Sequence, residues 1–306
     1  MSRGTRKLQK LAGGSFTITL PPDWVRRNGL EGGEELVVVE GSNFVKLMIP
    51  QKVEAKRSIK FTDQETTTYL LSVLYMQGIS EVTVESNGVI PQEAKRRMRE
   101  LQRELIGLEL VEEGFNFLKF KVKDEEGSTI GQEVSRFAEK VVNIAKDLSE
   151  GANNSIMLND VAERAAELTR DYRAVIRRIA RAVQLNEEDK LPPKDVILIA
   201  VGTRDLGRLL SHLESAARTA TNCRSLHPKV LEGVRTLAEL VSTAVNVFLT
   251  EDLDKVPEVR RGVKSLSSMG DLDSDVCSRE VGKEIARTSS YIMAIMDDGV
   301  HKSVRL

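Results

Sequence analysis

The sequence is poor in the residues that build covalent cross-links and metal sites. It has two cysteines and three histidines among 306 residues. Cys223 and Cys277 are far apart and show no C-x-x-C spacing, which predicts two buried thiols in a reducing cytoplasm. His212, His227 and His301 form neither H-x-x-x-H nor H-E-x-x-H. We therefore expect surface or capping histidines.

The chain also lacks an excess of charge of one sign and any long apolar run. Lys and Arg number 45 against 46 Asp and Glu, a net charge of −1. Without a global field to recruit nucleic acid, DNA binding would need a local basic patch. No segment resembles a signal peptide, and none approaches the roughly 20 apolar residues that span a bilayer. The expectation is a soluble, cytoplasmic protein with no membrane insertion.

Motifs of the common enzyme classes are missing too. Neither G-x-G-x-x-G nor G-x-x-x-x-G-K-[ST] occurs, so no loop that cradles phosphates is predicted. Nothing resembles the nucleophile elbow of a hydrolase. We expect no enzymatic activity and no cofactor.

What the sequence does contain is a mixture typical of globular proteins, with 41% hydrophobic and 30% charged residues. The 4% of aromatic residues favours helices packed by aliphatic side chains over a β-sandwich. A length of 306 residues allows two or three domains. Shifts in composition predict three: a β-rich module over 1–50, a small α/β domain over 52–126 and an all-α domain over 130–300.

The first segment is rich in glycine and in short strand-like runs. Gly13-Gly14 precedes an alternating run in which Phe16, Ile18 and Leu20 are apolar. A double proline and a short amphipathic stretch around Trp24 follow. Further glycines lead to a predicted hairpin made of Leu36–Glu40 and Phe44–Ile49.

This order of parts resembles the AbrB/SpoVT/MazE swapped-hairpin DNA-binding domain over residues 3–50. The segments that carry the resemblance are LPPDWVRRNGL and EGGEELVVVEG. It implies that two chains interleave their hairpins into one barrel and that basic residues on its face contact DNA. A homodimer is also expected on physical grounds, because fewer than about 50 residues of short strands bury too little apolar surface alone. The chain departs from the family at Gly13-Gly14-Ser15, where Arg or Lys is common.

Four cations open the chain without any neighbouring acid, and they are the candidate DNA-binding residues: Arg3, Arg6, Lys7 and Lys10. Such a locally unbalanced group can neutralise backbone phosphates. The alternative is a disordered, solubilising arm.

Residues 52–126 alternate between strand and helix patterns. Strands are predicted over Arg57–Phe61, Glu81–Glu85 and Phe115–Val122, and helices over Gln64–Gln77 and Pro91–Leu105. This βαβαβ order predicts a small α/β sandwich.

From about residue 130 onward, apolar residues recur every three or four positions, as helix packing requires. We count about six helices in two sets of three, 132–222 and 229–298, a possible internal repeat. One predicted helix carries a basic stripe made of Arg173, Arg177, Arg178 and Arg181. The stripe is either an outer face of the bundle or a surface for an acidic partner.

Two similar three-helix bundles in tandem resemble the PhoU family, which regulates phosphate uptake, and an AbrB-like segment ahead of them resembles an archaeal arrangement. The resemblance implies acidic metal-binding motifs on facing helices. Here Glu167, Asp205 and His212 match those motifs, but Thr169, Gly207 and Ser211 replace expected acids, and Lys283 and Arg287 put cations where acids should be. We therefore predict that the metal site is lost.

Three functions are open at this point. The first is a transcriptional regulator that binds DNA as a dimer and responds to phosphate status. The second is an adaptor that dimerises through the hairpin and docks a phosphate transporter ATPase or a sensor kinase. The third, a toxin-neutralising antitoxin, fits the first segment but not the large helical body.

Overall fold

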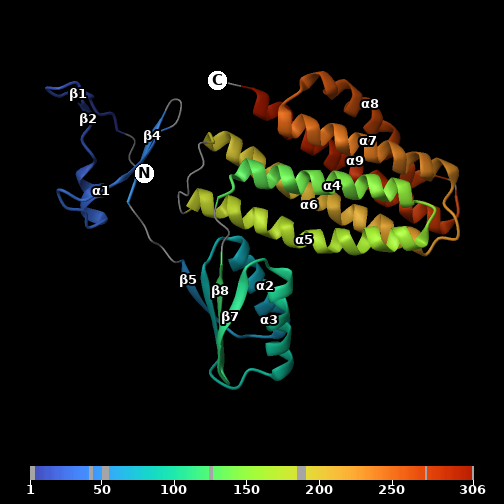
Figure 1. Ribbon diagram of the computed structural model, residues 1–306, viewed down its shortest axis with the longest axis horizontal. Helices are drawn as coiled ribbons and strands as arrows, with labels where there is room; N and C mark the ends of the chain where they lie inside the picture. The colour runs from blue at the N-terminus through green and yellow to red at the C-terminus, as the bar shows by residue number, and fades with distance from the viewer. Residues whose placement is uncertain are drawn as a thin grey trace. The chain divides into compact units, whose positions relative to one another are not determined.

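The computed structural model describes residues 4–40, 44–49, 55–123, 127–184, 191–272 and 274–304 (Figure 1). The chain divides into two compact units, Met1–Lys52 and Val53–Leu306. Among the helices in these described ranges, none is both long enough and apolar enough to cross a bilayer.

The first unit consists of two small hairpins and one short helix. Its elements are β1 (Gln9–Lys10), β2 (Phe16–Thr17), α1 (Pro22–Arg27), β3 (Val37–Glu40) and β4 (Val45–Met48). Strand β1 pairs antiparallel with β2, and β3 pairs antiparallel with β4. Helix α1 begins at Pro22, whose fixed φ suits a first turn. The predicted second hairpin and the predicted amphipathic stretch around Trp24 are confirmed.

The second unit opens with an α/β region. Its elements are β5 (Lys56–Lys60), α2 (Gln64–Met76), β6 (Glu81–Glu85), α3 (Gln92–Glu104), β7 (Leu108–Glu113) and β8 (Phe117–Val122). The sheet order is β5-β6-β8-β7, with β5 and β6 parallel and the other pairs antiparallel. The predicted elements are confirmed, but the prediction missed β7. Its sequence, LELVEE, is half acidic because the strand lies at an edge and its second half is exposed.

Helices α2 and α3 cover one face of this sheet (Figure 1). Val82 and Val84 of β6 and Phe120 of β8 are buried beneath them, as alternation along the strands requires. The opposite face is polar. There the Glu81 carboxylate lies 3.2 Å from the ammonium of Lys119 and 3.5 Å from that of Lys121.

Six long or medium helices complete the unit: α4 (Ile130–Gly151), α5 (Ser155–Gln184), α6 (Pro193–Thr221), α7 (Pro228–Thr250), α8 (Val256–Ser267) and α9 (Val276–Ser303). They share one continuous hydrophobic core, made mostly of aliphatic side chains. Helices α6 and α9 pack against each other, α5 packs on α6, and α7 and α8 pack on α9 (Figure 1). The predicted helices are confirmed, whereas an internal repeat stays a prediction.

The two cysteines form a disulfide, so the prediction of two separate thiols is wrong. Cys223 follows the end of α6 and Cys277 lies in the first turn of α9, with their Cα atoms 5.7 Å apart. Because α6 and α9 are packed together, residues separated by 54 positions in the sequence meet at one end of the bundle. The spacing alone carries no sign of this contact.

Candidate nucleic-acid interface

The first hairpin and the segment just before it present the predicted cations on their surface. Arg6, Lys7 and Lys10 are all exposed, and Lys10 belongs to β1, where it pairs with Phe16. The guanidinium of Arg6 donates to the carbonyl of Thr5 at 3.0 Å. The fourth candidate, Arg3, lies outside the described residues. The structure therefore brings three of the four candidates onto one short exposed segment.

Charge is divided unevenly along this unit. The sequence has no acid before Asp23, and that carboxylate is engaged by Arg26 at 2.7 Å. The remaining acids of the unit follow at Glu31, Glu34, Glu35 and Glu40. Because exposed charges are screened over roughly 8 to 10 Å at ordinary salt, a phosphate close to the first hairpin would feel mainly its cations. DNA binding by a chain with a net charge of −1 would need a local basic patch, and the exposed cations near the first hairpin form one.

The strands of this unit leave most of their apolar side chains in solvent. Phe16 is 58% exposed, Val38 61% and Val45 64%. Among the described residues of the unit, Met48 is the one buried hydrophobic side chain. A single copy therefore has almost no core, and these strands require a partner surface to be stable.

Comparison with known proteins bears on the first unit and on the few residues that follow it. Residues 9–56 match the sequence profile of a family described as "Antidote-toxin recognition MazE, bacterial antitoxin". Searches of curated proteins and of solved structures found no match. Residues 9–56 form a MazE/AbrB-like module. Modules of this kind typically dimerise and bind DNA. The resemblance of the helical region to PhoU stays a prediction.

The glycine turn of the MazE/AbrB-like module explains its departure from the family. Gly13 and Gly14 have φ angles of 102° and 90°, which L side chains rarely adopt. The turn closes where the N–H of Leu11 donates to the carbonyl of Ser15 at 2.8 Å. An Arg or Lys at either glycine would strain the backbone, so neither glycine position suits the cation that the family resemblance leads us to expect.

The matched metal-motif positions of the second unit have separate surroundings. Glu167 is exposed on α5. Asp205 is half-buried on α6, and burial raises its pKa against the opposing effects of Arg204 and Arg208. Nδ1 of His212 lies 2.7 Å from the carboxylate of Glu284 on α9. In the described ranges, no group of three or more His, Cys, Asp or Glu side chains could hold a metal ion.

Gly207, where the PhoU resemblance leads us to expect an acid, is packed against an aromatic ring. A Cβ built on Gly207 would lie 2.7 Å from the ring of Tyr172 on α5. Real Cβ atoms do not approach that closely, so an acidic side chain fits here only if Tyr172 moves. The contact between α5 and α6 therefore depends on glycine at this position.

Asp298 of α9 is an unusual group that sequence reasoning missed. It is 7% exposed, and within the described residues its Oδ2 has no hydrogen-bond partner. Burial, followed by the charges of Asp205 and Asp297, raises the pKa of Asp298 to about 7, while Lys302 opposes the shift. The sequence gives little indication that Asp298 is buried, since two adjacent aspartates in a helix are typical of a solvent-exposed face.

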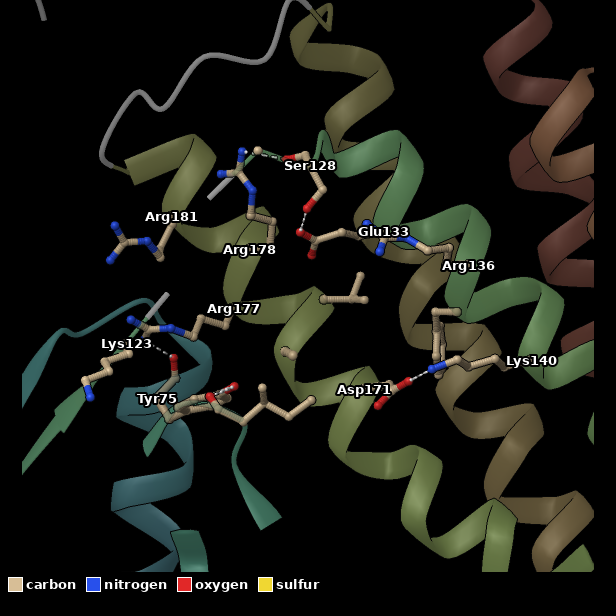
Figure 2. A pocket seen from close by; sticks show the side chains of 15 residues that line it. Tyr75, Lys123, Ser128, Glu133, Arg136, Lys140, Asp171, Arg177, Arg178 and Arg181 are labelled. Atoms are coloured by element: carbon tan, nitrogen blue, oxygen red, sulfur yellow. Dashed lines mark hydrogen bonds and ion pairs between the residues drawn. The ribbon is translucent and has the colours of Figure 1, made fainter. Parts of the chain in front are cut away.

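The sequence left two interpretations of the basic stripe of α5, an outer face of the bundle or a surface for an acidic partner. The structure contradicts the first of them (Figure 2). Arg177 is 3% exposed and donates to the backbone carbonyls of Tyr75 and Ile79, each at 2.8 Å. Arg173 reaches the carboxylate of Glu104 at 3.2 Å, Arg178 the carbonyl of Ser128 at 3.4 Å, and Arg181 the hydroxyl of Ser80 at 3.3 Å. The stripe thus joins α5 to the α/β region and to the segment before α4.

Proposed function

We propose that this protein is a transcriptional regulator that binds DNA as a homodimer through its MazE/AbrB-like module. The observation that carries the proposal is one hairpin with exposed cations on a module whose strands lack a core. Pairing two chains would cover Phe16, Val38 and Val45 and bring two copies of Arg6, Lys7 and Lys10 to one assembly. The protein needs no catalytic step for this role.

The helical region supplies the second part of the proposal. Its two sets of three helices resemble PhoU, and we assign to it the sensing or relay of phosphate status in the cytoplasm. The α/β region and the helices share contacts between α2 and α5 and between α3 and α5. A signal received by the helices can therefore reach the α/β region through packed side chains.

The direct test is an electrophoretic mobility shift with DNA from upstream of phosphate-transport genes, at low and at high salt. Each neutralised phosphate steepens the log–log salt dependence by about 0.9, so six cations in a dimer give a slope near −5. The variant Arg6→Ala/Lys7→Ala/Lys10→Ala should lose the shift. A matched control, Arg260→Ala/Arg261→Ala/Lys264→Ala, removes three exposed cations from α8 and should keep it. No shift of wild-type protein at low salt would refute the proposal.

A second candidate is an adaptor that dimerises without binding DNA and docks a phosphate transporter ATPase or a sensor kinase. The exposed apolar strands favour it, because dimerisation uses them and not the cations. A dimer in light scattering that never shifts DNA would select this role. The family name favours toxin neutralisation instead, but folded α/β and helical structure, not a short tail, follows residue 56.

A further inference from the structure

The disulfide of the second unit fastens a connection between helices to the start of another helix. Cys223 lies two residues beyond the end of α6, in the connection that leads to α7. Cys277 is the second residue of α9, which packs against α6, α7 and α8. The bond therefore holds the connection between α6 and α7 against the first turn of α9.

The same connection is also held by contacts that do not depend on sulfur. The N–H of His227 donates to the buried hydroxyl of Ser278 at 2.9 Å, one residue beyond Cys277. The side chain of Leu226 is buried in the core of the bundle. The carboxylate of Asp275 caps α9 by accepting from the N–H of Ser278 at 3.0 Å. Breaking the disulfide therefore loosens this connection, while the surrounding contacts keep the bundle folded.

The surroundings of the two sulfur atoms suit the reduced state as well as the oxidised one. The carbonyl oxygen of Thr219, in the last turn of α6, lies 3.5 Å from Sγ of Cys223 and 3.8 Å from Sγ of Cys277. A sulfur atom in a disulfide has no proton to donate, but each thiol of the reduced pair would have this acceptor within reach. Both cysteines are partly exposed, so small thiols and oxidants in the solvent reach them.

A permanent disulfide at this place does not fit the compartment in which a DNA-binding regulator works. That compartment is the cytoplasm, where thiol reductants keep most cysteine pairs reduced, and where disulfides that do form commonly serve redox sensing. In this respect the inference rests on the proposed function. We propose that Cys223 and Cys277 form a reversible redox switch, a dithiol that oxidants close into the disulfide and thereby stiffen the connection between α6 and α7.

Hydrogen peroxide is the class of oxidant that closes the switch. The thiolate of one cysteine attacks a peroxide oxygen, the O–O bond breaks, and a sulfenic acid and hydroxide form. The thiolate of the other cysteine attacks the sulfenic sulfur, the S–O bond breaks, and the disulfide forms as a second hydroxide leaves. The protons of the two thiols neutralise the two hydroxides. Two thiols and one peroxide thus give one disulfide and two water molecules.

A small thiol such as glutathione opens the switch again. The first glutathione thiolate attacks one sulfur, forms a mixed disulfide with that cysteine and releases the other as a thiolate. A second glutathione thiolate attacks the glutathione sulfur of the mixed disulfide and releases the remaining cysteine. The two protons of the glutathione thiols end on the protein thiols, and the two glutathiones leave as one oxidised molecule.

The first test measures the oxidation state of the folded, full-length protein. The protein is equilibrated in mixtures of reduced and oxidised glutathione, including one poised as the cytoplasm is, and its free thiols are alkylated and counted by mass spectrometry. We expect both thiols to be free in the cytoplasm-like mixture and the disulfide to return when hydrogen peroxide is added. A disulfide that persists in that mixture would be a structural cross-link and would overturn the switch.

The second test measures what the bond does to the chain. Hydrogen exchange of residues 222–227 should be about tenfold faster or more in the reduced protein than in the oxidised one, whereas α2 should exchange alike in both. Cys223→Ser should exchange like the reduced protein before and after peroxide. Ser225→Ala, an exposed position in the same connection, keeps both cysteines and should still switch. Equal exchange of the wild type in its two states would refute the stiffening.

Neither measurement uses DNA. Failure of the mobility shift would therefore refute the proposed function and leave the thiol count and the exchange rates to decide on the switch. A protein that shifts DNA but keeps its disulfide in the cytoplasm-like mixture would retain the proposed function and lose the switch.

Discussion

Arg177 holds Tyr75 in two ways: it donates to the Tyr75 carbonyl at 2.8 Å, and its guanidinium lies 5.1 Å from the centroid of the Tyr75 ring. The same guanidinium donates to the carbonyl of Ile79. Both carbonyls belong to the end of α2 and the turn after it, where helix carbonyls lack partners within the helix. One buried side chain from α5 thus adds hydrogen bonds at the C-terminal end of α2 and in the turn after it.

Replacing Arg177 should destabilise the second unit. Arg177→Met removes the donor to both carbonyls; the Tyr75 carbonyl keeps the N–H of Gly78 at 3.0 Å, whereas the Ile79 carbonyl loses the bond from Arg177, and we expect a cost of about 1–3 kcal/mol. Arg177→Lys keeps the charge but loses the planar fork, and should recover only part of the loss. Urea unfolding followed by circular dichroism measures both. The exposed Arg260→Met should change the midpoint little, and equal midpoints for all three variants would contradict the assigned role.

The raised pKa of Asp298 predicts that the free energy of unfolding falls as pH rises, which is opposite to the effect of a salt-bridged carboxylate. Its folded pKa is about 7, above the ordinary carboxyl value of 3.8, so between these values the folded state holds a proton that the unfolded state has released. Stability therefore falls as pH rises from about 4 to 7, and the full penalty, at most about 4 kcal/mol, applies above pH 7. Asp298→Asn should flatten this slope and unfold at higher urea than wild type at pH 8.

Thermal and urea unfolding of Asp298→Asn across pH 4–8 check this expectation. Exposed Asp254→Asn is the control for removing a carboxylate and should keep the slope of the wild type. The difference between wild type and Asp298→Asn should shrink toward pH 4, where the folded wild type keeps its proton and the unfolded carboxyl is about half protonated. A constant difference across the whole range would show that Asp298 acts through packing and not through its charge.

The disulfide between Cys223 and Cys277 should stabilise the bundle. Closing a loop of 54 residues restricts the unfolded chain by about 4 kcal/mol in the entropic treatment. We expect a reducing agent to lower the melting temperature of the wild type, and Cys223→Ser/Cys277→Ser to match the reduced protein. The double variant should not respond to reduction. Two thiols titrated per chain in unreduced, unfolded protein would contradict this bond.

Much of the fold was predictable because its signals are local. Apolar residues at helical spacing, such as Val134, Phe137 and Val141, all face one core, and each stripe identifies its own helix. Strand β7 lacked such a signal, because Glu109, Glu112 and Glu113 outnumber its buried apolar positions. An edge strand is fixed by pairing with β8 and not by its own pattern.

The sites that were missed depend on contacts distant in the sequence. Arg177 resembles any solvated cation on a helix until α2 is placed against α5. Asp298 becomes buried only because α9 packs among α6 and α7. The basic run near Arg6, Lys7 and Lys10 was recognisable because the absence of acids is a local property. The lack of a core around the apolar strand residues was predictable from the length of the segment alone, because so short a segment buries little apolar surface.

Those apolar residues lead to the prediction that dimerisation depends on the MazE/AbrB-like module. Phe16→Ser/Val38→Ser removes two exposed side chains from separate hairpins of each chain. Burial of such side chains contributes roughly 1.5–3 kcal/mol each, so the dimer dissociation constant should rise at least about 100-fold. Light scattering over a concentration series measures it. Phe115→Ser is the matched control, because Phe115 is 81% exposed but lies between β7 and β8 of the second unit. If Phe115→Ser dissociates the dimer and the paired variant does not, the interface lies outside the module.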